Sequence, residues 1–261
     1  MNKAETLKEL VGNSVSRRAF AQRTITAGLW TGGAILAGGA TSTVSAQSVS
    51  DVDVLNFALN LEYLEAEFYT VATTGRRIAD IGVGVSGTGN SGATTGGAAV
   101  SLDSRSRAVA EHVTLDEQQH VRFLRDALGS AAVAKPAINL EALGLGFRNQ
   151  AEFLTLARAF EDLGVSAYAG AANLISSRAL LMAAAQIALT EGQHAGVFRL
   201  LVSDNNVRVP QVDSLDVPPL MSPNGRLFQV DGNGLSTART AAQVLAVAGP
   251  FFPSGVNGNI R

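Results

Sequence analysis

The chain has 261 residues, 20 basic and 22 acidic side chains, a formal net charge of −2, and no cysteine. The lack of cysteine excludes disulfides, thiolate-bound metals and lipid attachment through Cys. No basic patch indicates nucleic-acid binding, so we expect no nucleic acid among its partners.

The first 46 residues have the pattern of an export signal. Arg17 and Arg18 form a twin-arginine pair, a weakly apolar run covers residues 25–40, and "VSA" at 44–46 is a small-x-small cleavage site. A membrane anchor is the alternative, but glycines and threonines interrupt the apolar run. We predict a twin-arginine signal peptide at residues 1–46, export to the periplasm or the exterior, and no stable membrane anchor after cleavage. The remaining chain has 15 basic and 20 acidic residues, a net charge of −5, and is long enough for one domain.

Helical periodicity marks four long stretches of the remaining chain, at about residues 51–73, 104–128, 149–175 and 177–203. The third stretch opens on Asn149 and Glu152, which have the spacing of a capping box. Helices of this length are longer than the globular average and are typical of four-helix bundles.

The connections between these stretches predict how the helices pair. Little more than "ISSR" separates the third and fourth, which favours an antiparallel hairpin. The first and second are joined by a Gly-, Thr- and Ser-rich tract at 82–101, which we interpret as a flexible loop. About 20 residues that include Pro136 join the second and third, enough to run the length of a bundle. Two hairpins and one long crossover predict an all-α four-helix bundle at residues 47–204.

After Asp204 the chain becomes Pro-rich and irregular. One short helix is expected at about residues 237–248, and the aromatic pair Phe251-Phe252 favours docking of this tail on the bundle. We therefore expect residues 205–261 to form a C-terminal extension packed on the bundle.

Two of the three histidines occupy the same Glu-x-x-His frame, in "EQQH" at 117–120 and "EGQH" at 191–194. On a helix, residues three apart face the same side, and both pairs lie on the apolar stripe of their helix. The other two long helices each place a Tyr seven residues after a Glu, in Glu62–Tyr69 and Glu161–Tyr168. The chain thus repeats a Glu-x6-Tyr helix followed by a Glu-x-x-His helix.

Four carboxylates that converge in a dry helical core repel one another, and each would be costly to bury unpaired. Two divalent cations would balance their charge, and imidazole with carboxylate suits iron, manganese or zinc. We predict two divalent transition-metal ions, Fe or Mn, with six protein ligands: Glu62, Glu117, His120, Glu161, Glu191 and His194. In this arrangement Glu117 and Glu191 bridge the ions, while Tyr69 and Tyr168 donate hydrogen bonds to ligands. The alternative is a core whose polar groups satisfy one another without metal.

Other polar residues near these motifs have more ordinary interpretations. Glu65 could compete for the first helix's ligand position, but we expect it to be a neighbour at the edge of the stripe. We expect Glu67 to be solvated and His112 to be exposed, although His112 could instead support a ligand. We expect Asp116 and Asp162 to form ion pairs or caps, since each faces about 100° away from the adjacent ligand.

The stretch "NFALNLEYLEAEFY" at 56–69 resembles the first helix of the ferritin-like domain of twin-arginine-exported bacterial proteins and plant desiccation-related proteins. The tail sequences "TARTAAQVLAVA" and "FFPSGVNG" resemble the same subgroup, and the resemblance covers about residues 50–255. It implies a ferritin-like fold with all six ligand positions filled. The Gly-rich tract and the long tail depart from cage-forming ferritins, which argues against a storage shell.

Three functions are compatible with these patterns. The first is redox chemistry with O2 or peroxide at the metal pair, as in a ferroxidase or a dimanganese catalase. The second is a non-enzymatic stress- or desiccation-related protein in which metal stabilises the bundle or the site is vestigial. The third, iron storage, would require a multi-subunit cage. A homodimer is a further possibility.

Overall fold

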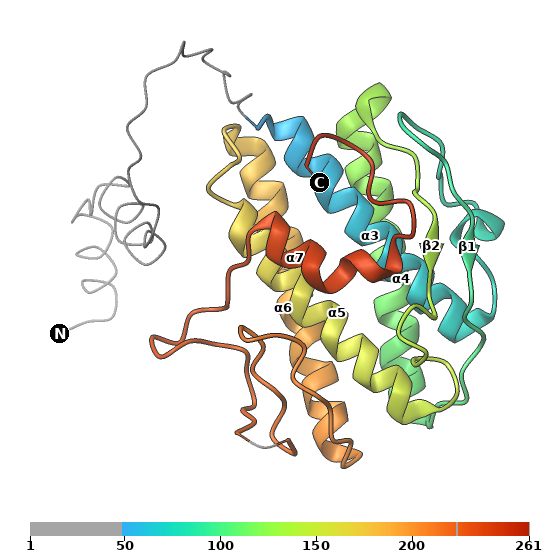
Figure 1. Cartoon of the computed structure of the whole chain (residues 1–261), viewed down its shortest axis with the longest axis vertical. Helices are drawn as coiled ribbons and strands as arrows, with labels where there is room; N and C mark the ends of the chain where they lie inside the picture. Colours follow the sequence, from blue (N-terminus) through green and yellow to red (C-terminus); the bar gives the residue numbers. More distant parts are fainter. Residues whose placement is uncertain (1–48, 223, 261) are drawn as a thin grey trace, which may run out of the picture. The chain divides into compact units, whose positions relative to one another are not determined.

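The computed structural model describes residues 49–222 and 224–260 (Figure 1). The predicted signal peptide, with Arg17 and Arg18, lies outside the described residues. None of the helices in the described ranges combines the length and hydropathy needed to cross a membrane.

Five α-helices dominate the described chain: α3 (Asp51–Thr74), α4 (Ser104–Leu128), α5 (Gln150–Ala171), α6 (Arg178–Asp204) and α7 (Ala241–Ala248). The all-α prediction, with a helical bundle and a C-terminal extension that holds one short helix, is confirmed. Helix α5 ends at Ala171, four residues before its expected end. The following residues turn the chain into α6, and the backbone N–H groups of Ser176 and Ser177 donate to the Asp51 carboxylate.

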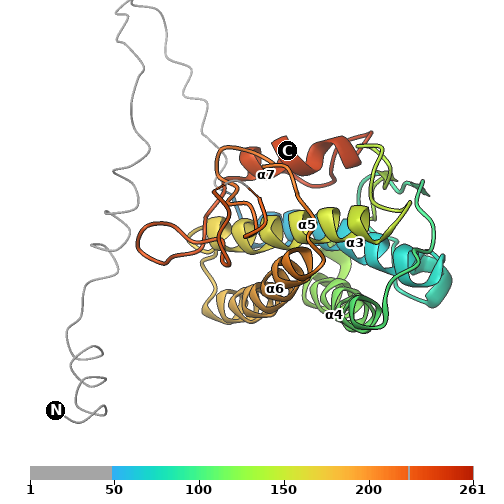
Figure 2. The ribbon, with the colours of Figure 1, turned by 90° about the horizontal axis from the view of Figure 1, so that it is seen from below.

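The four long helices pair as two hairpins, α3 with α4 and α5 with α6. Seen from below, α3 and α5 lie in one layer and α4 and α6 in the other, with α7 on the outer face of the first layer (Figure 2). Helices α3 and α5 are antiparallel, since Tyr69 contacts Glu161 while Tyr168 contacts Glu62. The long crossover between the hairpins was predicted from the length of the 129–149 connection.

These helices begin at side-chain caps, which are formed by polar residues that precede the apolar pattern. Ser50 and Asp53 form a reciprocal capping box on α3. Asn149 accepts from the Glu152 N–H at 3.0 Å, but the Glu152 carboxylate accepts from the N–H groups of Gly146 and Arg148. Only half of the capping box expected at α5 is therefore present, because Glu152 holds the preceding turn instead.

The Gly-rich tract at 82–101 is not a loose loop, so its interpretation as a flexible connection was wrong. It follows a 3₁₀ turn (Ile78–Ile81) and includes strand β1 (Thr94–Thr95), which pairs in parallel with β2 (Ile138–Asn139) of the crossover. Glycines permit the close approach: a Cβ on Gly92 would lie 2.1 Å from the Ala137 backbone nitrogen. The two long connections thus pack on each other.

Glu67 lies under this tract and is not solvated as predicted. It is 1% exposed, accepts a hydrogen bond from Thr94 Oγ1 at 2.8 Å and one from the Ile78 N–H, and lies 3.6 Å from Lys135 Nζ. Because a buried carboxylate needs such partners, Glu67 ties the Gly-rich tract and the crossover to α3.

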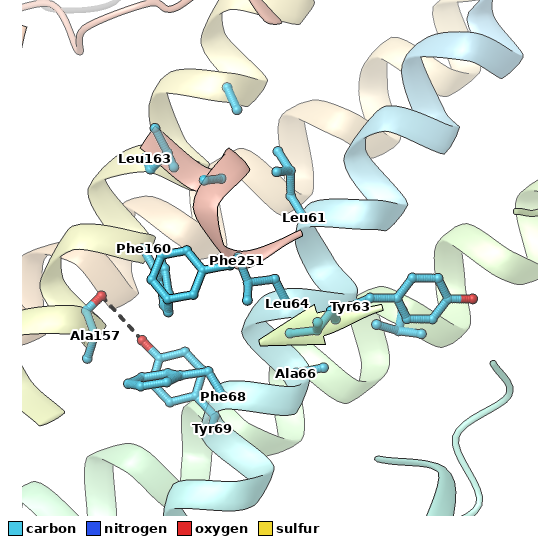
Figure 3. Close-up of a cluster of buried hydrophobic side chains, with 14 of the residues drawn as sticks. Leu61, Tyr63, Leu64, Ala66, Phe68, Tyr69, Ala157, Phe160, Leu163 and Phe251 are labelled. Carbon is cyan, nitrogen blue, oxygen red and sulfur yellow. Dashed lines mark hydrogen bonds between the residues drawn. The ribbon is translucent and has the colours of Figure 1, made fainter. Parts of the chain in front are cut away.

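The C-terminal extension packs on the layer formed by α3 and α5. Phe251 meets Phe160 of α5 edge to face, beside an aromatic cluster around Phe68 and Tyr69 (Figure 3). Polar anchors supplement this apolar contact, among them the ion pair between Arg158 Nη1 and Asp216 Oδ1 at 2.7 Å. The outer face of the first layer is thereby covered.

Candidate metal centre

The six predicted ligand residues meet in the middle of the bundle. Helix α3 contributes Glu62, α4 contributes Glu117 and His120, α5 contributes Glu161, and α6 contributes Glu191 and His194. All six are buried, and the four glutamates are at most 1% exposed. The 3.6-residue period places each of them on the inward face of its helix.

Their ligand atoms form two groups of four in which all atoms lie within 4.8 Å of one another. One group holds Glu62, Glu117, His120 and Glu191; the other holds Glu117, Glu161, Glu191 and His194. Two residues, Glu117 and Glu191, belong to both groups. Each group is therefore a set of three carboxylates and one imidazole, a donor set suited to hard or borderline divalent metals.

The nitrogens that face the carboxylates are the Nδ1 atoms of both histidines. His120 Nδ1 lies 3.2 Å from Glu117 Oε2 and 3.3 Å from Glu62 Oε2. His194 Nδ1 lies 3.0 Å from Glu117 Oε1 and 3.3 Å from Glu161 Oε2. Because these separations are short, the Nδ1 atom of each histidine and its neighbouring carboxylate oxygens surround a common point.

Hydrogen bonds from outside the cluster orient three of the ligand residues. His194 Nε2 lies 3.1 Å from Asp116 Oδ2, which directs Nδ1 inward and confirms the expected ion-pair role of Asp116. Tyr69 of α3 donates to Glu161 Oε1 of α5 at 2.5 Å, and Tyr168 of α5 donates to Glu62 Oε1 of α3. Each tyrosine therefore holds the glutamate of the opposite helix and leaves its second oxygen free to face the cluster.

A family model described as a ferritin-like domain matches residues 50–204. The chain belongs to the ferritin-like domain family. This match covers all four helices that carry the buried cluster. No curated protein matches the sequence.

Unsatisfied atoms provide a direct test of whether this ferritin-like site fits a metal. Among the described residues, several fully buried cluster atoms have no hydrogen-bond partner: Glu62 Oε2, Glu117 Oε1, Glu161 Oε2, both Glu191 oxygens and His194 Nδ1. Buried polar atoms are almost always satisfied in folded proteins. All of these atoms belong to the two ligand groups, so the residues fit bound cations.

The pKa values of the cluster in the metal-free protein also indicate that its carboxylates need balancing cations. Burial and the neighbouring carboxylates raise the pKa of Glu191 well above its ordinary value, and burial raises that of Glu117 to about 7. Burial opposes charge on the histidines, but the carboxylates outweigh it and raise the pKa of His194 to about 12 and that of His120 still further. Without metal, the ferritin-like core holds protons in place of other cations.

Two further residues, Glu65 and Gly164, lie beside this centre but outside the two ligand groups. Glu65, expected at the edge of the stripe, is only 5% exposed and lies by the cluster. Gly164 of α5 faces Glu191, and a Cβ there would lie 2.5 Å from Glu191 Oε2. The repeat itself could have indicated both positions, because each lies three residues after the glutamate of its Glu-x6-Tyr helix.

The remaining polar residues lie where the sequence predicted. His112 is exposed on α4. Asp162, next to Glu161, faces away from the cluster and accepts from Arg199 Nη1 of α6 at 2.7 Å. Neither residue belongs to the ligand groups.

Proposed function

We propose that this ferritin-like protein binds two divalent transition-metal ions, iron or manganese, and uses them in redox chemistry with O2 or peroxide. The observation that carries the proposal is the pair of buried ligand groups that share Glu117 and Glu191, with their facing atoms unsatisfied by protein. In this assignment Glu62 and His120 would hold one ion, Glu161 and His194 would hold the other, and Glu117 and Glu191 would serve as ligands of both.

Charge balance supports two ions in preference to one. Four buried glutamates carry four negative charges if ionised, and no Lys or Arg forms an ion pair with any of them in the described chain. Two divalent ions neutralise that charge, whereas one leaves two carboxylates uncompensated in a low-dielectric core. The mixed imidazole and carboxylate donors suit iron and manganese, which can cycle between divalent and trivalent states.

The protein's own contribution is to bind the ions, to orient their ligand side chains and to enclose the site. Tyr69, Tyr168 and Asp116 fix three ligand side chains, and burial raises the pKa of both tyrosines well above the ordinary value, so they remain hydrogen-bond donors at neutral pH. The surrounding apolar core keeps bulk water away from the cluster. When bound, the metal ions would supply one-electron redox chemistry toward O2 or peroxide.

We also propose that the chain is exported by the twin-arginine route and acts in the periplasm or outside the cell. Arg17, Arg18 and the "VSA" sequence at 44–46 support this. That route carries folded proteins, which would allow the buried centre to be filled before export.

The main alternative is a stress- or desiccation-related protein in which metal only staples the four helices together. The cluster supports this structural function because it links all four helices at one point. The two functions differ in what loss of a ligand should do. A ligand variant should abolish turnover under the redox proposal but should lower only the melting temperature under the structural one.

The first test is elemental analysis of the protein purified after native export. Close to two iron or manganese atoms per chain would support the proposal, and metal near zero that Fe(II) or Mn(II) cannot restore would overturn it. Glu117→Gln and His194→Gln should then abolish O2- or peroxide-dependent turnover of the loaded protein. His112→Gln is the matched control, because His112 is exposed on the same helix as Glu117.

A further inference from the structure

A hollow of about 160 Å³ lies between the α5–α6 hairpin and the C-terminal extension. Asp162 and Val165 of α5 form one wall, and α6 forms the floor. The roof is a turn of the extension, closed by a backbone bridge between Val230 and Ser236. None of the six predicted metal ligands lines this hollow, so it is separate from the candidate metal centre.

The floor is open because α6 has glycine at two positions four residues apart, Gly192 and Gly196. A Cβ at either position would meet no atom of the described residues within 4 Å. Glycine costs a helix interior about 1 kcal/mol relative to alanine, and no close contact requires it here. The two glycines thus leave room above the backbone of α6 that larger side chains would fill.

The walls are largely apolar and hold one buried acceptor without a donor. Val165, Ala195 and Val230 line the hollow, and the ring of Phe228 stands at its edge, 59% exposed. Gln229 Oε1 is fully buried, yet it has no hydrogen-bond partner within residues 49–222 and 224–260. Since buried acceptors are almost always satisfied, Gln229 indicates that a donor from outside the protein occupies this space.

The charged side chains at the hollow already balance one another. Asp162 accepts from Arg199 Nη1 at 2.7 Å, and neither residue is more than 4% exposed. Arg199 also donates to three backbone carbonyl groups of the extension. A charged ligand would bring an unpaired charge into this poorly solvated site, so an uncharged ligand is favoured.

We propose that this hollow binds a small uncharged aromatic ring that carries a hydroxyl group, such as a phenol or a hydroquinone. A cavity of roughly 150 Å³ accommodates a benzene ring, which matches the space between the extension and α6. The ring would pack between Phe228 and the floor at Gly192 and Gly196. Its hydroxyl, which is neutral at pH 7, would donate to Gln229 Oε1. This binding function is independent of the metal pair.

The test is calorimetric titration of the full-length protein with phenol and, in parallel, with benzene, which has no hydroxyl. The wild-type protein should bind phenol with a Kd of about 1 mM or below. Gln229→Met keeps the length of the side chain but removes the acceptor, so the phenol affinity should fall at least about five-fold. The benzene affinity should not change in this variant.

Gly196→Leu fills the floor and should weaken the binding of both probes at least about ten-fold. Ala185→Leu is the matched control, because Ala185 is exposed on the same helix and does not line the hollow. It should leave both affinities unchanged. If Gly196→Leu does not fold, Gly192→Leu fills the same floor and should give the same result.

Three outcomes would overturn the proposal. A folded wild-type protein that does not bind phenol up to its solubility limit would leave a water molecule as the donor to Gln229. Phenol binding that is unchanged in Gly196→Leu would place the ring elsewhere. Tighter binding of myo-inositol, an uncharged ring with hydroxyl groups but no aromatic face, would exclude the aromatic class. The metal content should be the same in every variant, so these results are distinct from a failure of the proposed metal function.

Discussion

Gly164 and Gly192 are both helical glycines near the metal centre, but they differ in what surrounds them. A Cβ on Gly164 would lie 2.5 Å from Glu191 Oε2, whereas a Cβ on Gly192 of α6 would have no atom within 4 Å. Alanine normally stabilises a helix interior by about 1 kcal/mol relative to glycine. Alanine at position 164 would not give this stabilisation, because its Cβ would overlap the Glu191 carboxylate.

Gly164→Ala should displace the Glu191 carboxylate and weaken metal binding by about ten-fold or more, and the overpacking should cost about 1–3 kcal/mol of stability. Gly192→Ala should raise the free energy of unfolding by about 0.5–1 kcal/mol and leave metal affinity unchanged. Chelator competition measures the affinities, and thermal unfolding measures the stabilities. Equal metal affinity in the two variants would contradict the assigned role of Gly164.

The pKa values of the two ligand histidines predict how metal binding depends on pH. In the metal-free protein the surrounding carboxylates raise the pKa of His194 to about 12 and that of His120 further, so both rings are protonated at pH 7. A metal binds only the neutral ring. Two bound ions should therefore release at least two protons, and the product of the two association constants should rise at least about 100-fold per pH unit near neutrality.

Calorimetry of Mn(II) binding in two buffers of different protonation enthalpy counts these protons directly. His112→Gln should leave the count unchanged, because the exposed His112 does not belong to the ligand groups. Release of fewer than two protons would mean that the rings are already neutral in the metal-free protein, and the carboxylates would then not control them as described.

At the scale of single elements, the long helices could be predicted because their signal is local. The apolar period, the lengths and polar residues such as Ser177 mark α3 to α6 to within a few residues of their observed bounds. The end of α5 was missed because it depends on Asp51, which is distant in sequence and accepts from the turn that follows.

The Gly-rich tract shows the limit of local sequence information. Its composition indicates flexibility, but Gly87 and Gly92 are instead positions where another backbone approaches too closely for a side chain. Its partner, the crossover, lies more than 40 residues further along the sequence, so no local pattern indicates the pairing. Glu67 was misassigned for the same reason, because its partners Thr94 and Lys135 come from those two connections.

The candidate site was more predictable than the loops. The six residues of the ligand groups share helical periodicity and a repeated spacing, and the structure brings all of them together. What periodicity cannot give is which helices oppose each other. The crossed contacts of Tyr69 with Glu161 and Tyr168 with Glu62 follow from the antiparallel arrangement of α3 and α5, as does the placement of Glu65 against Gly164.

On the scale of the whole described domain, the extension and the bundle are joined by buried charge. Arg199 of α6 is 1% exposed and donates to Asp162 of α5 and to the backbone carbonyl groups of Val217, Arg226 and Leu227. Burial raises the pKa of Asp162 to about 6 even though Arg199 and Arg158 oppose the shift. One guanidinium thus connects a helix next to the metal centre with three points of the extension.

Arg199→Met should release the extension while the bundle remains folded. Removing the guanidinium leaves Asp162 with only the more distant Arg158, at 3.5 Å, and leaves the carbonyl groups without their donor. Breaking a buried pair in this way costs about 3–5 kcal/mol. Arg105→Met is the matched control, because Arg105 pairs with Asp204 at the end of the same helix but is 61% exposed, so its loss should cost at most about 1 kcal/mol.

Limited proteolysis distinguishes the two variants, with thermal unfolding as the second measurement. Cleavage within residues 205–240 should be much faster in Arg199→Met than in the wild-type protein or in Arg105→Met, because these residues are held by the carbonyl contacts of Arg199 more than by an apolar core of their own. Equal cleavage rates in all three proteins would show that the Arg158–Asp216 ion pair and the hydrogen bonds from Arg239 to Ser166 of α5 suffice to hold the extension. In that event Arg199 would act mainly within the bundle, as the partner that keeps Asp162 charged beside Glu161.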